Sequence, residues 1–240
     1  MGYTISVEKE KTDFERDVSE AGSFAELMLR MESKGVFVGE EFVSERILEN
    51  VSDRKIFKYW FYVLDDAVDW GLLKKEAWLL GDLLSGNRDP RLAGRMVETV
   101  FSLISFVDSD RCLQNARISD ILVLLMDSLE KAFPGILLSS CDGKGRNPLE
   151  AFFFDVGVGR KMEAAVLSGR LTSGDLTEIG NWMVENTGIF DVLCFLVQKA
   201  GFDPEREYSP GISLSSLVGT EVSTELRKKT VVVWSPQPEK

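Results

Sequence analysis

The sequence contains no histidine among its 240 residues. This absence excludes Ser-His-Asp and Cys-His catalysis and zinc sites built from cysteine and histidine. Cysteine is also scarce: Cys112, Cys141 and Cys194 lie far apart and form no CxxC pair. Such usage predicts free thiols in a reducing compartment rather than a disulfide framework. Cys194 lies within an apolar run, so we expect its side chain to be buried.

Long apolar runs are missing as well. The longest, Ile121–Met126 and Val192–Val197, are far shorter than the roughly 20 residues of a membrane-spanning helix. The first residues are acidic and lack the basic-then-apolar pattern of a secretion signal. These features predict a cytoplasmic protein without a membrane span.

Positive charge is under-represented, with 28 Lys and Arg against 39 Asp and Glu and a formal net charge of −11. An acidic chain repels nucleic-acid phosphate and anionic lipid, which disfavours direct binding of nucleic acid. Apolar residues make up 44% and charged residues 28% of the chain, a composition typical of folded globular proteins. We therefore expect the partner to be another protein or a second copy of the chain.

Helix signals dominate what the sequence does contain, and they predict an all-α fold, a multi-helix bundle or array of about nine helices. Ser23 followed by Glu26 forms a capping box, and the pairs Asp89-Pro90 and Asn147-Pro148 are typical helix starts. A helix is expected from an Asp53 cap to about Trp70, closed by Gly71. The next helices expected are Lys74–Leu84 and, capped by Ser119, Asp120–Phe133. In Glu40–Asn50, Phe42, Ile47 and Leu48 are expected to face inward.

The composition along the chain suggests two helical halves. Residues 1–20 are expected to form an N-terminal arm, followed by a helical half over residues 21–138. Residues 139–148 are rich in glycine and small polar side chains and predict a loop or boundary. A second helical half is expected over 149–201. The last segment, 202–240, is expected to be an irregular tail with one short strand at Thr230–Trp234.

One acidic motif suggests metal chemistry. Asp65, Asp66 and Asp69 have DDxxD spacing, which places the outer two one helical turn apart, and such a trio can bind Mg²⁺. The motif resembles the first aspartate-rich motif of the class I isoprenoid synthases, an all-α family. The resemblance implies a Mg²⁺-dependent enzyme that handles a diphosphate, with Lys74 or Arg160 steadying the phosphates. The sequence shows no second acidic motif of the kind that this family requires.

The same helix also has a simpler interpretation. The three aspartates belong to a polar stripe opposite an apolar row, which predicts that Asp65 faces water and that Trp60 belongs to the core. Aromatic residues crowd 57–62 and 152–154, which predicts that these segments are buried in the core or, as the alternative, that they contact a partner helix. We therefore favour a non-enzymatic helical protein that binds a protein partner, as an adaptor, or self-assembles. No residue is assigned a catalytic or cofactor-binding role, and the magnesium enzyme is the alternative.

Overall fold

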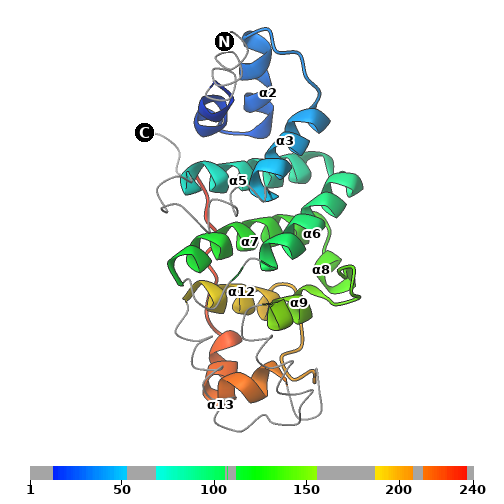
Figure 1. Ribbon diagram of the computed structural model, residues 1–240, viewed down its shortest axis with the longest axis vertical. Coiled ribbons are helices and arrows are strands. Elements are labelled where there is room, and N and C mark those ends of the chain that lie inside the picture. Colours follow the sequence, from blue (N-terminus) through cyan, green and yellow to red (C-terminus); the bar gives the residue numbers. More distant parts are fainter. Residues whose placement is uncertain are drawn as a thin grey trace, which may run out of the picture. The chain divides into compact units, whose positions relative to one another are not determined.

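Figure 1 shows a computed structural model of the chain, which describes residues 13–52, 69–105, 107, 112–155, 187–207 and 213–236. Within these residues every regular element is a helix, so the prediction of an all-α fold is confirmed. None of the described helices is long and apolar enough to cross a membrane. Residues 13–20 are helical, and the helices that follow are α2 (Phe24–Ser33), α3 (Glu40–Ser52), α5 (Trp70–Asn87), α6 (Pro90–Ile104), α7 (Cys112–Ala132), α8 (Ile136–Ser139), α9 (Pro148–Asp155), α12 (Thr187–Gln198) and α13 (Leu214–Leu226).

Several helices begin at the caps that the sequence predicts. The Ser23 hydroxyl accepts a hydrogen bond from the Glu26 N–H at 3.1 Å at the start of α2. At α9, Asn147 Oδ1 accepts from the Glu150 N–H at 2.8 Å, and Glu150 Oε2 accepts from the Asn147 N–H at 2.9 Å. Helix α6 begins at Pro90, as predicted. The side chains of Ser23, Asn147 and Glu150 satisfy N–H groups that the first turn of a helix leaves without backbone partners.

The start of α5 differs from the prediction. Trp70 begins this helix rather than ending the previous one, because Asp69 caps it: Asp69 Oδ1 accepts from the Leu72 N–H at 2.9 Å. Gly71 therefore lies in the first turn and is not a stop. The helix also runs past its predicted end to Arg88, which takes the left-handed conformation of a C-cap at φ 47°.

Helix α7 is longer than the sequence suggested. It begins at Cys112, and Ser119, the predicted cap, is a buried residue inside the helix. The cap signal is overridden because Ile118 and Leu122, four residues apart on one row, are both buried and favour a continuous helix. The predicted end holds, since α7 stops two residues before Pro134.

The chain divides into two compact units, one of Met1–Arg95 with Trp234–Lys240 and one of Met96–Val233. The boundary between the units falls within α6. The sequence suggested a loop or a boundary at residues 139–148, and residues 140–147 form a loop. That loop lies inside the second unit, because the helices on its two sides join one core: α8 packs on α7, α9 packs on α12, and α7 packs on α12.

In the first unit, α2 and α3 both pack against α5 (Figure 1). The Phe24 N–H at the start of α2 donates to Asp82 Oδ2 on α5 at 2.8 Å, which fixes the two helices together. The side chains between them are aliphatic or aromatic and recur at helical spacing. The buried ones include Phe24, Leu27, Met31, Val43, Ile47, Leu48, Val51, Leu73, Ala77, Leu80 and Leu84.

One carboxyl group is buried between α3 and α5. Glu76 is 1% exposed, and its Oε1 accepts a hydrogen bond from Asn50 Nδ2 at 2.9 Å. Within the described part of the chain, its Oε2 has no hydrogen-bond partner. Burial raises the pKa of Glu76 to about 7, because the charged form loses its hydration there.

In the second unit, α12 packs along α7 and also contacts α9 and α13 (Figure 1). Its side chains from Val192 to Leu196 are all buried, which accounts for the uninterrupted apolar run in the sequence. Cys194 is among them, as predicted. Burial raises the pKa of this thiol to about 11, so it stays protonated at neutral pH.

The C-terminal segment is more ordered than predicted. The segment predicted to be an irregular tail with one short strand contains a helix, α13, which starts at a capping box between Ser213 and Ser216. Gln198 Nε2 on α12 donates to the Leu226 carbonyl and, at 2.8 Å, to the Lys229 carbonyl. The residues Thr230–Trp234 form no strand. A run of β-branched residues is not sufficient for a strand unless a second strand pairs with it.

Candidate docking surface

The predicted metal ligands are only partly described. Asp69 is the N-cap of α5, and its Oδ1 is used in the bond to the Leu72 N–H. Asp65, Asp66 and the predicted core residue Trp60 lie outside the described residues. Over the part that the structure describes, no three Asp, Glu, Cys or His side chains come together as a metal site would require. The magnesium interpretation stays a prediction.

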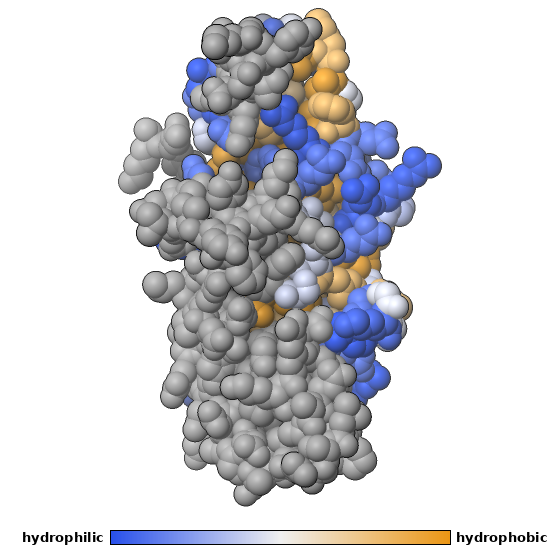
Figure 2. All heavy atoms as spheres, viewed as in Figure 1, coloured by the Kyte–Doolittle hydropathy of each residue, from blue (hydrophilic) through white to orange (hydrophobic). Residues whose placement is uncertain are grey.

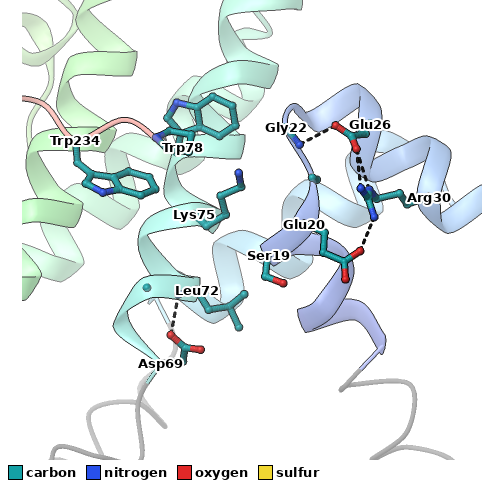
Figure 3. A pocket seen from close by; sticks show the side chains of 13 residues that line it. Ser19, Glu20, Gly22, Glu26, Arg30, Asp69, Leu72, Lys75, Trp78 and Trp234 are labelled. Atoms are coloured by element: carbon teal, nitrogen blue, oxygen red, sulfur yellow. Dashed lines mark hydrogen bonds and ion pairs between the residues drawn. The ribbon is translucent and has the colours of Figure 1, made fainter. Parts of the chain in front are cut away.

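Asp69 also lines a cavity of about 820 Å³ in the first unit (Figure 3). Arg30 forms ion pairs there with Glu20 at 2.6 Å and with Glu26 at 2.8 Å. The Gly22 N–H and the Arg30 guanidinium lower the pKa of Glu26. The Lys75 ammonium lies 4.9 Å from the ring centre of Trp78. The charged groups on this wall therefore interact mainly with one another or with aromatic rings.

A different part of the first unit exposes large apolar side chains. They come from the second half of α2, the α2–α3 loop and the first turn of α3, and we call them the apolar surface. Figure 2 shows orange spheres gathered over this segment, with blue spheres beside them. The members and their exposed fractions are Leu29 (64%), Val36 (41%), Phe37 (84%) and Phe42 (59%).

The exposure of Phe42 corrects the expectation that it faces inward. Residues in the buried row of α3 are three or four positions apart: Val43, Ile47 and Val51. Phe42 precedes this row by one residue, about 100° around the helix, and therefore points away from α5. Leu29 lies two residues from both Leu27 and Met31 of the buried row of α2, which places it on the opposite side of that helix.

The backbone of the α2–α3 loop is held in place. Gly35, at φ 79°, ends α2, and its N–H donates to the Glu32 carbonyl at 2.9 Å. The Val36 N–H donates to the Met31 carbonyl at 3.0 Å, which completes a Schellman motif. The Lys34 ammonium forms an ion pair with Asp17, a buried carboxylate. The loop therefore presents Phe37 from a fixed base.

An acidic cleft of about 390 Å³ adjoins the apolar surface, between the start of α3, the end of α5 and the start of α6. Arg95 and Glu45 pair across it at 2.8 Å. Glu40 accepts from Asn87 at 3.4 Å. Phe42 is three residues before Glu45 on α3, so the two side chains are neighbours on the helix. The charged residues of the cleft are Glu40, Glu41, Glu45, Asp89, Arg91 and Arg95.

Compared with known protein families, curated proteins and solved structures, the chain finds no match.

This surface was not predicted from the sequence, in which the aromatic segments 57–62 and 152–154 are the stronger signal. The first lies outside the described residues, and in the second Phe152 is fully buried. A signal was nevertheless present in the sequence. Phe42 does not share the three- and four-residue spacing of Val43 and Ile47, and a strict comparison of those positions separates the two faces of α3.

Proposed function

We propose that this chain is a non-enzymatic helical adaptor that binds another protein through its apolar surface. The observation that carries the proposal is the exposure of Phe37, which is 84%, in a segment that exposes three further apolar side chains. Contiguous apolar patches on a protein surface are typical of interaction sites, because leaving them in water is unfavourable. Aromatic residues are enriched in such sites.

The fixed loop supports the same proposal. The Schellman motif at Gly35 and the Lys34–Asp17 ion pair hold the backbone on which Phe37 lies. A pre-organised surface loses little conformational entropy when a partner binds, so more of the contact energy contributes to affinity.

Site-specific crosslinking tests the proposal. We would replace Phe37 with the photo-crosslinking residue benzoylphenylalanine in the full chain and irradiate cells that express it. Val232 is a matched control, since it is apolar and 86% exposed but belongs to the second unit. We expect defined protein adducts from position 37, their loss when Phe42→Ser is added, and none of these adducts from position 232. Adducts that are the same from both positions, or that persist with Phe42→Ser, would contradict the proposal.

A further inference from the structure

Several acidic side chains border the apolar surface. Glu32 on α2 and Glu40 and Glu41 on α3 are exposed. No salt bridge is found for Glu32 or Glu41 among the residues that the structure describes. The nearby Lys34 is paired with Asp17, so it does not offset them. The border of the apolar surface is therefore negatively charged.

The adjoining cleft has the same sign. The Arg95–Glu45 ion pair balances one charge of each kind. Of the other charged residues that line the cleft, three are acidic, Glu40, Glu41 and Asp89, and one, Arg91, is basic. Asp89 accepts the Arg91 N–H at 2.9 Å as a helix cap, a bond that leaves its negative charge in place. The cleft is thus an acidic hollow directly beside Phe42.

We infer that the partner contacts this surface with a basic amphipathic segment, whose apolar side chains cover Phe37 and Phe42 while a lysine or arginine enters the acidic cleft. The inference rests on the proposed function and adds the chemistry of the partner. Apolar contact supplies affinity in such an interface, and complementary charge supplies orientation and a faster encounter.

The same charges disfavour nucleic acid, an anionic membrane and a second copy of the chain as the partner of the apolar surface. Phosphates of nucleic acid or of an anionic membrane are repelled by the acidic border. A second copy of the chain also carries a net charge of −11, so two copies repel each other over long range. A basic protein segment is the occupant that fits both the apolar and the acidic part.

A pair of model peptides tests the inference with the full chain. The probe is a helical peptide of leucine and lysine, about 18 residues long, and its partner has glutamate in place of every lysine. We would measure binding by fluorescence anisotropy as salt is raised. We expect saturable binding of the lysine peptide that weakens with salt and no binding of the glutamate peptide. Equal binding of the two peptides would overturn the inference.

Matched charge reversals separate the cleft from the overall charge of the protein. Glu41→Lys should weaken binding of the lysine peptide roughly tenfold. Glu207→Lys changes the net charge equally at an exposed position in the second unit and should leave the affinity within about twofold. Equal losses in both variants would show that only the net charge matters, which contradicts a specific cleft.

Other outcomes identify other occupants and also overturn the inference. Binding to phosphatidylglycerol vesicles that Phe37→Ser abolishes would assign the surface to a membrane. Concentration-dependent assembly that the same substitution abolishes would assign it to a second copy. If crosslinking from position 37 succeeds while the peptides show no charge preference, the adaptor function stands and the basic partner does not.

Discussion

Two segments, one in each unit, differ in how far their apolar side chains are exposed to solvent. In α12 the run from Val192 to Leu196 is entirely buried between neighbouring helices. In the α2–α3 segment, by contrast, Phe37 and Phe42 are mostly exposed. Both segments contain large apolar side chains, and among the described residues it is the α12 run that has helices packed over it. An apolar side chain stabilises this fold where neighbouring helices bury it. The exposed apolar side chains do not contribute in this way and are candidates for contact with a partner protein.

The largest effect is expected in the buried region. Phe195→Ala on α12 removes a side chain that is fully buried and should lower the free energy of unfolding by about 3–5 kcal/mol, because it loses apolar contacts and leaves a cavity. Denaturant melts of the full chain measure the change. A loss below about 1 kcal/mol would mean that α12 does not form the tightly packed core described above.

The next effect concerns Glu76, the carboxyl group buried between α3 and α5. The pKa of Glu76 is raised from 4.5 to about 7 in the folded protein, so the folded state binds more protons than the unfolded state between these values. Its contribution to stability is fully present below pH 4.5 and is lost as the pH rises to about 7, by roughly 3 kcal/mol.

The variant Glu76→Gln checks this pH dependence. Its free energy of unfolding should decrease less than that of the unsubstituted chain between pH 4.5 and 7. Identical slopes in the two proteins would contradict a raised pKa at Glu76.

A smaller effect distinguishes the two roles suggested for Asp69. Asp69→Ala removes the cap of α5 and should cost about 1 kcal/mol. Asp69→Asn keeps a capping oxygen but removes the negative charge, so its stability should stay close to that of the unsubstituted chain. Denaturant melts with and without Mg²⁺ measure the free energy of unfolding of each variant. A Mg²⁺-dependent gain in stability that both substitutions remove would support the metal interpretation instead.

The smallest effect is expected at the apolar surface. Phe37→Ser removes a side chain that is 84% exposed and should change the free energy of unfolding by no more than about 0.5 kcal/mol. Thermal and denaturant melts are the measurement. A large destabilisation would show that Phe37 packs against the protein in solution and is not available to a partner.

The sequence was sufficient for features that depend on neighbouring residues. The caps at Ser23 and Asn147 form local hydrogen bonds, so the starts of α2 and α9 were predictable. The end of α2 rests on the same kind of local chemistry, since Gly35 takes a left-handed conformation that closes the helix.

Features that depend on distant contacts were not predictable. Ser119 has a good cap sequence, yet packing of Ile118 and Leu122 extends α7 past it. The burial of Glu76 depends on Asn50, which is 26 residues away. The apolar surface likewise depends on a distant contact. The spacing of Phe42 separates it from the buried row of α3, but it is the packing of α3 against α5 that covers that row and leaves Phe42 exposed.

The most direct test of the account measures stability and binding on the same variant. Phe42 lies on the exposed side of α3. We therefore expect Phe42→Ser to leave the denaturant midpoint unchanged and to abolish the crosslinks formed from position 37. Crosslinks that persist at full yield would contradict a binding role for the apolar surface. A midpoint that falls in parallel with the crosslinks would contradict the separation between the covered and uncovered apolar side chains.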